Sequence, residues 1–216
     1  MFNHIHHEFP RIEQFNNNGK RLYRTPSGKA YPSVTTITGQ IKKQAIKEWR
    51  ERVGKEKAAA ITAKASKTGT RVHLLCEDYL SNKELRSKEF DLEMWESIKP
   101  ELDSINNIHG LETKLFSDHL EVAGTVDCVG EYNGKLSIID FKTSNKPKKK
   151  EWINDYFMQT AAYAVAFEER TKIPVSNLVI IMAVSQKGSV IFEEKRDTWI
   201  DDFIDLRNQY REEHGC

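Results

Sequence analysis

Apolar and polar residues alternate in the middle of the chain, whereas on both sides of this stretch apolar residues recur every third or fourth position. Alternation is typical of half-buried β-strands, and the wider spacing is typical of amphipathic helices. The predicted strands are 112–116, 121–132, 135–142, 178–184 and 190–194. The predicted helices are 42–65, 71–80, 91–106, 155–170 and 198–213. Thr68 and Gly69 are expected to interrupt the first helical run, and Thr70 is a candidate N-cap of the second helix.

The order of these elements predicts an α/β fold in which helices flank a mixed central β-sheet. Upstream, a Pro-Ser-Gly turn in LYRTPSGKAYPSV predicts a short hairpin. We expect a flexible start over residues 1–18 and a single domain over residues 19–216. Within this domain, a basic and mainly helical N-terminal part (19–66) should precede the core (67–216).

Composition agrees with one domain, because 216 residues of which 38% are hydrophobic can bury one sizeable core. The chain has no apolar run of 18 residues, and its first 15 residues lack the pattern of a signal or transit peptide. Its three cysteines form no CxxC pair, so neither a disulfide framework nor a zinc site is expected. These features predict an intracellular protein with reduced thiols.

The net charge of +1 conceals a strong asymmetry along the chain. Residues 19–57 contain eleven Lys and Arg against three Glu, whereas residues 76–121 contain twelve Asp and Glu against five Lys and Arg. The basic segment favours a polyanionic partner, although an ordinary solvated face is an equally good interpretation of charge alone.

Two aspartates and a lysine lie in the strands on either side of an Asn-Gly pair at 133–134. Asn-Gly predicts a two-residue type I′ turn, and this turn sets the register of the two strands. Counting from the turn, Asp127 lies opposite Asp140, and Lys142 lies opposite Thr125 on the same face. Like charges directly opposed on an antiparallel pair are destabilising, so this arrangement requires a compensating charge.

Val129 and Ile138, the neighbouring positions on this face, are apolar, so the two acids should rise from a core-like surface. Lys142 offsets one carboxylate and leaves room for a divalent cation. Hard oxygen ligands favour Mg²⁺ or Mn²⁺, bound as one or two ions. The alternative is a solvent-facing hairpin with incidental acids and a salt-bridged lysine.

A second hairpin adds another candidate carboxylate. If residues 117–120 form its loop, Phe116 pairs with Glu121, and Glu112 lies opposite Thr125 on the face of Asp127. An ordinary exposed strand Glu is an equally good interpretation of Glu112.

Asp127, followed thirteen positions later by Asp140-Phe141-Lys142, resembles the active-site signature of the PD-(D/E)XK nuclease superfamily. Three further matches to its RecB-like branch are GTxxH in Gly69-Thr70-Arg71-Val72-His73, GxxD in Gly124 to Asp127, and QxxxY in Gln159 to Tyr163. The segment Pro32-Ser33-Val34-Thr35-Thr36, followed by Trp49-Arg50, resembles the amino-terminal part of mitochondrial genome maintenance exonucleases and phage exonucleases. The four cysteines of the iron–sulfur members are absent, so no iron–sulfur cluster is expected.

The resemblance implies a restriction-endonuclease-like core and a metal-dependent active site. The candidate metal ligands are His73, Glu112, Asp127, Asp140 and the carbonyl of Phe141. An imidazole ligand shifts the preference toward Mn²⁺ over Mg²⁺. Lys142 would position or deprotonate the attacking water and stabilise charge in the transition state. Gln159 and Tyr163, four residues apart, would share a helix face that borders the active site, although plain helix packing also explains them.

The resemblance also implies contacts to backbone phosphates and bases, because basic and aromatic residues together suit single-stranded nucleic acid. The candidate DNA-binding residues are Ser33, Thr35, Lys42, Lys43, Trp49, Arg50, Thr70, Lys146, Lys148 and Lys149. As a bare charge run, the last three lysines are more typical of a solvated loop.

The leading functional hypothesis is a metal-dependent DNA exonuclease that acts on single strands or strand ends in DNA replication, repair or recombination. An endonuclease for structured or duplex DNA is the closer alternative, and a catalytically inactive DNA-binding adaptor is the other. DNA is the expected partner, with replication or recombination proteins as further candidates, and no membrane association is expected. No apolar face or coiled-coil pattern indicates an oligomer, so a monomer is expected.

Overall fold

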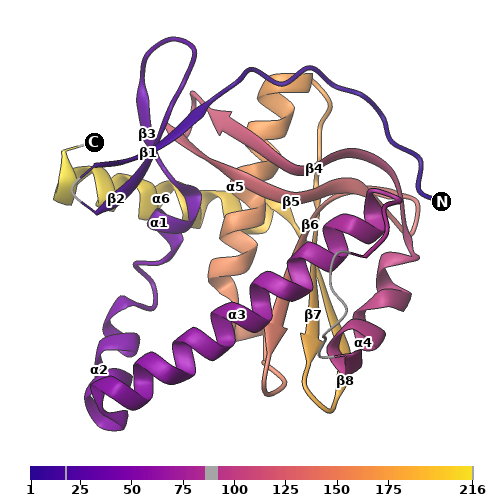
Figure 1. The fold of residues 1–216 in the computed structure, drawn as a ribbon. Coiled ribbons are helices and arrows are strands. Elements are labelled where there is room, and N and C mark those ends of the chain that lie inside the picture. Colours follow the sequence, from indigo (N-terminus) through magenta and orange to yellow (C-terminus); the bar gives the residue numbers. More distant parts are fainter. Residues whose placement is uncertain (18, 86–91, 216) are drawn as a thin grey trace.

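A five-stranded mixed sheet forms the centre of the computed structural model, which describes residues 1–17, 19–85 and 92–215 (Figure 1). The strands are β4 (Ile105–Ser117), β5 (Val122–Tyr132), β6 (Lys135–Ser144), β7 (Asn177–Val184) and β8 (Gly188–Lys195), and they lie side by side in this order. All neighbouring strands are antiparallel except β6 and β7, which are parallel and are connected through a helix. The predicted mixed sheet is therefore confirmed.

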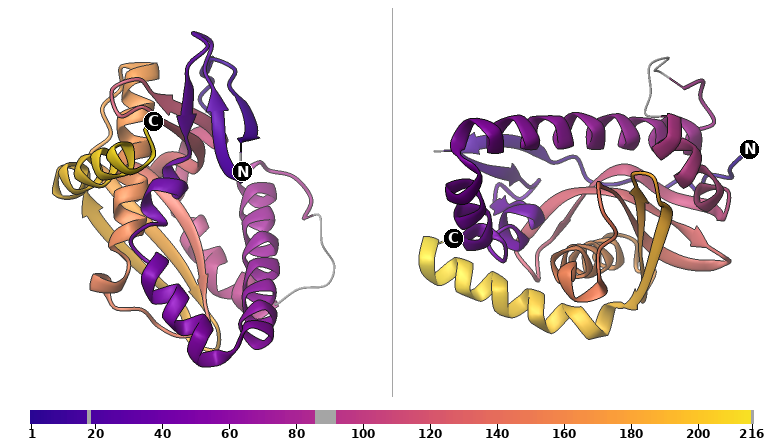
Figure 2. Two further views of the ribbon diagram at one scale, coloured as in Figure 1. Left: turned by 90° about the vertical axis from the view of Figure 1, so that its left-hand side faces the viewer. Right: turned by 90° about the horizontal axis from the view of Figure 1, so that it is seen from below.

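Helices cover both faces of the sheet, as the view from below shows (Figure 2). One face carries α3 (Lys55–Leu80) and α4 (Leu92–Leu102), and the other carries α5 (Asn154–Thr171) and α6 (Arg196–His214). β7 lies between these layers and is buried at every position, which explains its continuous apolar sequence. Among the described residues, no helix has the length and the apolar character needed to cross a membrane.

The N-terminal part begins with strands rather than helices, so the prediction that it is mainly helical is wrong. β1 (Glu13–Asn17), β2 (Lys20–Arg24) and β3 (Ala30–Pro32) form a small antiparallel sheet, and β2 and β3 are the predicted hairpin. Tyr23 and Tyr31 are buried against Phe116 and Ala123 of the central sheet. This packing stabilises strands whose local sequence contains only a weak alternation.

Two shorter helices, α1 (Val34–Thr38) and α2 (Lys43–Val53), connect the small sheet to α3. The helical run breaks at Gly54, with φ at +90°, and α3 continues through Gly69, where an interruption was predicted. A glycine inside a helix costs about 1 kcal/mol relative to alanine. Packing of this part of α3 against the sheet offsets that cost, because Val72, Leu75 and Cys76 are buried there.

Most of the remaining boundaries differ from the predictions by a few residues. The larger exception is β4, which begins at Ile105 although the predicted strand begins at residue 112. The predicted helix 91–106 ends at Leu102, and Ile105 and Asn106 belong to β4. Its predicted start at Asp91 lies outside the described residues. Ile105 and Ile108 are buried in the core beside α3 and α4, which favours an early start of β4.

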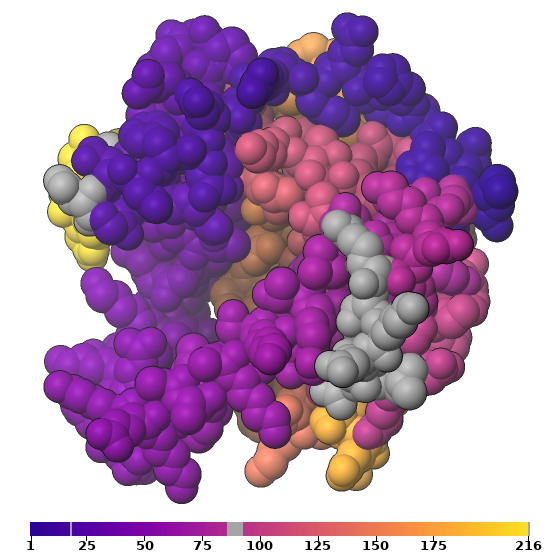
Figure 3. Space-filling model, viewed as in Figure 1, coloured from indigo at the N-terminus to yellow at the C-terminus, as the bar shows by residue number. Residues whose placement is uncertain are grey.

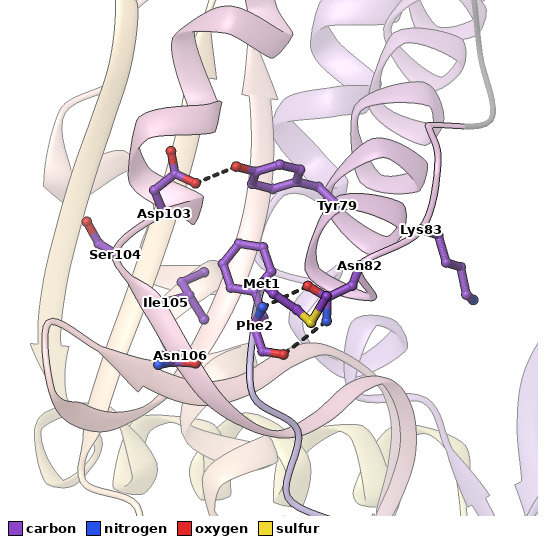
Figure 4. A pocket seen from close by; sticks show the side chains of 9 residues that line it. All are labelled: Met1, Phe2, Tyr79, Asn82, Lys83, Asp103, Ser104, Ile105 and Asn106. Atoms are coloured by element: carbon purple, nitrogen blue, oxygen red, sulfur yellow. Dashed lines mark hydrogen bonds between the residues drawn. The ribbon is translucent and has the colours of Figure 1, made fainter.

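The first residues lie along the end of α3 and the start of β4 (Figure 4). The backbone N–H of Phe2 donates to Asn82 Oδ1 at 2.7 Å, and the Phe2 ring meets Tyr79 edge-on. Further along, the His4 Nε2 atom lies 2.8 Å from the carbonyl oxygen of Leu80. These contacts describe one position of the segment, and the flexibility expected for residues 1–18 stays a prediction.

Candidate active site

The hairpin between β5 and β6 has the register predicted from its Asn-Gly turn. Pairing runs from Tyr132 and Lys135 to Cys128 and Ile139, and it stops one position before the two aspartates. There the strands part, because β5 continues along β4 and β6 continues along β7.

Asp127 fills the gap that opens between the two strands. Its Oδ2 atom accepts a hydrogen bond from the backbone N–H of Phe141 at 2.9 Å, in place of a bond between strands. In a strand, the N–H and C=O groups of one residue point toward the same neighbour, so the Phe141 carbonyl also points toward this gap. Lys142 accordingly has no paired partner in β5, and Thr125 pairs with Lys114 on the other side.

The second predicted register, between β4 and β5, is wrong by two residues. Ser117 pairs with Val122, so the loop consists of residues 118–121 instead of the predicted 117–120. The Ser117 hydroxyl stabilises this loop by accepting a hydrogen bond from the N–H of Leu120. A shift of two keeps every side chain on its face. Glu112 therefore stays on the predicted face, beside Asp127 instead of Thr125, and its φ of +47° interrupts the pairing there.

Side chains from three elements converge in a cleft of about 440 Å³ between α3 and the strands. His73 of α3, Glu112 of β4 and Asp127 of β5 each offer a ligand atom, and these atoms lie within 4.8 Å of one another. Thr70 and Lys142 line the same cleft. Figure 3 shows the surface hollowed above α3, between the N-terminal sheet and the strands β4 and β5.

Asp140 lies beside this cluster and is almost completely buried. Gln159 of α5 donates a hydrogen bond from Nε2 to Asp140 Oδ1 at 2.8 Å. The other oxygen, Oδ2, accepts no well-aligned hydrogen bond from a described residue and lies 2.5 Å from the ammonium of Lys142. The carboxylate is thus held by one amide and one cation.

The charges in the cleft influence one another. Partial desolvation, together with the Asp127 carboxylate, raises the pKa of Glu112 to about 7, although its side chain still reaches solvent. Burial also raises the pKa of Asp140, and the ammonium of Lys142 limits this rise. For Lys142, burial opposes the charged form, but Asp140 and Asp127 outweigh it and raise its pKa above the ordinary value. Lys142 is therefore an ammonium ion in this arrangement.

The GxxD motif on β5 and the QxxxY motif on α5 lie in contact, through Gly124 and Tyr163. A Cβ atom on Gly124 would lie 2.4 Å from the hydroxyl oxygen of Tyr163, so only glycine permits this approach of β5 to α5. Tyr163 is buried, and desolvation raises the pKa of its hydroxyl well above the ordinary value. Tyr163 thus packs the helix onto the strand, while Gln159 on the same helix reaches Asp140.

The donor set fits a divalent cation. One imidazole nitrogen and several carboxylate oxygens suit Mg²⁺ or Mn²⁺. The two cysteines among the described residues, Cys76 and Cys128, are buried in the core. The buried Oδ2 of Asp140, with no aligned hydrogen bond, is a further oxygen available to a cation.

The candidate DNA-contact residues lie in several places. Ser33 is buried as the N-cap of α1, and Arg21 donates hydrogen bonds to its hydroxyl and to that of the exposed Thr35. Lys43 and Arg50 line a groove of about 1850 Å³ between α2, α3 and α6.

The other candidates are not gathered in that groove. Lys42 makes an ion pair with Asp155. Lys146 and Lys149 are exposed, whereas Trp49 and Lys148 are half-buried.

Sequence reasoning missed three residues around the site. Glu77 lines the cleft four positions after His73, and this helical spacing could have indicated it. Arg21 and Asp155 had no local signal, because their partners Ser33 and Lys42 lie on other elements.

An α/β sheet with these acids and this lysine in one cleft defines a nuclease of the PD-(D/E)XK class. The sequence-family model of the PD-(D/E)XK nuclease superfamily matches residues 23–213, so the chain belongs to this superfamily. The chain is also similar to mitochondrial genome maintenance exonuclease 1 of several vertebrates. It is 32% identical to the Xenopus tropicalis protein over 183 residues, which cover 77% of this chain and 52% of that relative.

Two mammalian relatives match shorter stretches. The Homo sapiens protein is 32% identical over 155 residues, covering 65% of this chain and 44% of the relative. The Mus musculus protein is 35% identical over 128 residues, covering 54% and 38%. The chain thus spans about half the length, or less, of the curated relatives it matches.

Proposed function

We propose that the chain is a divalent-metal-dependent DNA exonuclease that hydrolyses phosphodiester bonds in single strands or at strand ends, in DNA replication, repair or recombination. The observation that carries this proposal is the convergence of His73, Glu112, Asp127 and Lys142 in one cleft, with Asp140 directly behind Lys142. Membership of the superfamily, the mixed sheet flanked by helices and the name of the exonuclease relatives support it.

The metal would be held by His73, Asp127, Asp140 and the Phe141 carbonyl, with Glu112 as a further ligand. A divalent ion at this place would activate the attacking water and offset charge on the phosphate oxygens. Gln159 acts as a positioning residue, because its hydrogen bond fixes the orientation of the Asp140 carboxylate.

Lys142 contributes positive charge and hydrogen-bond donors. Because it is an ammonium ion beside Asp140, it is suited to orient the attacking water and to stabilise the negative charge of the transition state. Removing a proton from the water would require a neutral amine, which the two neighbouring carboxylates oppose. The products would be a shortened strand and a 5′-phosphorylated fragment.

Substitution of the central pair tests the site. Asp140→Ala and Lys142→Ala should each lower the rate of hydrolysis with Mn²⁺ at least about a hundredfold, because each removes a charge from the reacting centre. Asp201→Ala, at an exposed position on α6, is the matched control and should keep the wild-type rate. Cleavage by either cleft variant at the rate of the control would contradict the assignment.

The mode of attack is tested with one strand in two forms. A linear single-stranded oligonucleotide, labelled at either end, should be shortened stepwise, and the same strand closed into a circle should stay intact. Cutting of the circle would indicate an endonuclease, and binding without cutting of either form would indicate an inactive adaptor. The order in which the two labels are released gives the polarity.

A further inference from the structure

A second group of charged side chains lies beside the candidate metal centre, around the ring of Tyr156 in the first turn of α5. The ammonium nitrogens of Lys42, Lys142 and Lys148 lie 4.7, 4.9 and 5.9 Å from the ring centroid. Lys42 directly precedes α2, Lys142 belongs to β6, and Lys148 belongs to the loop after β6. Lys142 is therefore shared between the metal centre and this lysine cluster.

The lysine cluster contains more positive than negative charge. Lys142 is paired with Asp140 at 2.5 Å, and Lys42 is paired with Asp155, whose two carboxylate oxygens both lie 2.6 Å from its ammonium nitrogen. Lys148 is half-buried and makes no ion pair with a described residue. Burial and the neighbouring charge of Lys42 lower the pKa of Lys148, so the two ammonium groups repel each other.

The other lysines of the same loop lie in different surroundings. Lys150 makes an ion pair with Glu194, and Lys149 is exposed above the ring of Trp152 at 5.6 Å. Lys146 is exposed as well. Of this basic tract, Lys148 is the lysine directed toward Tyr156 and the candidate metal centre.

We propose that Lys42, Lys148 and Tyr156 form a subsite for one phosphate group of the DNA strand, next to the phosphate at the candidate metal centre. An anion between Lys42 and Lys148 would remove their mutual repulsion and supply the missing negative charge. Tyr156 holds the ammonium groups together through the face of its ring, and Asp155 keeps Lys42 in place before a strand binds. The subsite rests on the proposed function, since it places the strand beside the cleft that Lys142 lines.

The first test measures binding of a single-stranded oligonucleotide in EDTA, so that the strand stays uncut. Lys148→Met removes the charge and keeps the length of the side chain. Lys187→Met makes the same change at an exposed position on the turn between β7 and β8 and is the matched control. Lys148→Met should weaken binding about tenfold and lower the salt slope by about 0.7. A Lys148→Met protein that binds as tightly as the control overturns the subsite.

The second test locates the phosphate with single methylphosphonate linkages, each of which removes one charge from the strand. In the wild-type protein, one linkage next to the cleaved bond should weaken binding, and in Lys148→Met the same linkage should have no further effect. Strands with a 5′-phosphate or a 5′-hydroxyl separate a terminal phosphate from an internal one. A linkage that is equally sensitive in both proteins would contradict the assignment to Lys148.

Hydrolysis with Mn²⁺ separates failure of the subsite from failure of the proposed function. If Asp140→Ala abolishes cutting while Lys148→Met binds like the control, the nuclease assignment stands and the subsite is wrong. If the wild-type protein does not cut DNA, the proposed function fails, and the binding measurements still decide whether Lys148 contacts a phosphate.

Discussion

Asp140 shows how one buried carboxylate is held in place. Its two oxygens have different partners, the Gln159 amide on one side and the Lys142 ammonium on the other. Burial and the Asp127 carboxylate raise the pKa of Asp140, and the Lys142 ammonium limits this rise. The geometry of the site therefore depends on a residue of α5 that does not itself reach the cleft.

Removal of the Gln159 amide should disturb the site without unfolding the protein. Gln159→Ala is expected to lower Mn²⁺ affinity ten- to a hundredfold, because the ligand carboxylate loses the group that orients it. Titration calorimetry with Mn²⁺ measures this change. Gln209→Ala, at an exposed position on α6, is the control, and equal affinities of the two variants would contradict a positioning role for Gln159.

As a proposed metal ligand, Glu112 should couple metal binding to pH. Its folded-state pKa is raised from 4.5 to about 7, so its contribution to stability is fully present below pH 4.5 and is lost as the pH rises through 7. A protonated carboxyl does not ligate a cation. Mg²⁺ should therefore raise the melting temperature more at about pH 8 than at about pH 6, as thermal unfolding with and without Mg²⁺ would show.

Glu112→Asn tests whether this pH dependence comes from Glu112. Asparagine tolerates the positive φ at this position, so the fold should be kept, and the part of the pH dependence that comes from Glu112 should disappear. An unchanged pH dependence of the Mg²⁺ effect in Glu112→Asn would mean that Glu112 is not a ligand.

The long helix α3 carries His73 and Thr70 to the cleft. The glycine that directly precedes it, Gly54, differs in its role from Gly69 within it. Gly54 has φ at +90° and ends the preceding helix, whereas Gly69 lies within α3, where a Cβ atom would meet Thr143 Oγ1 at an ordinary 3.6 Å. A glycine in a helix interior is favourable only if something requires its missing side chain. Gly69 lines the cleft, and because a Cβ would make only this ordinary contact there, the packing of α3 does not require the glycine.

Gly69→Ala should stabilise the protein by about 0.5–1 kcal/mol, since alanine loses less conformational freedom in a helix. Gly54→Ala should destabilise it by about 1 kcal/mol or more, because a Cβ is strained at its positive φ. Urea denaturation of both variants measures these changes. A Gly69→Ala protein less stable than Gly54→Ala would show that the close packing of α3 needs the glycine.

The parts of the molecule differ strongly in burial. α2 has no buried residue, whereas β7 is buried at every position. Local opening is easiest where few apolar groups are removed from water. We therefore expect α2 to open locally more easily than β7.

Amide hydrogen exchange should follow this difference. The amides of α2 are expected to exchange orders of magnitude faster than those of β7, and single-stranded DNA should slow exchange in α2, if Lys43 and Arg50 contact the strand. Mass spectrometry of exchanged peptides, with and without DNA, measures both effects. Equal protection of α2 and β7 in the free protein would contradict the expectation.

Predictions that depend on residues close together in the sequence were right, whereas several that depend on contacts between distant residues were wrong. The Asn-Gly turn determined the β5–β6 register, since the turn type and the strand pairing depend on neighbouring residues. The second hairpin lacked such a turn, and its register was wrong by two residues, although the face of Glu112 was right. The predicted helix break at Gly69 was wrong, because tertiary packing outweighs a local preference of about 1 kcal/mol.

The sequence by itself determined the α/β class and the strands that carry the acids, because periodicity and turn signals are local properties. It indicated His73, Asp127, Asp140 and Lys142 through their resemblance to the superfamily signature, and their roles stay proposals. Only the tertiary structure decided how these residues are connected. The Asp127 contact to the Phe141 backbone, the Gln159 amide on Asp140, and the pairing of Lys42 with Asp155 join residues that are distant in sequence or belong to different elements. Such contacts depend on how helices and strands pack, and no local pattern along the chain encodes that packing.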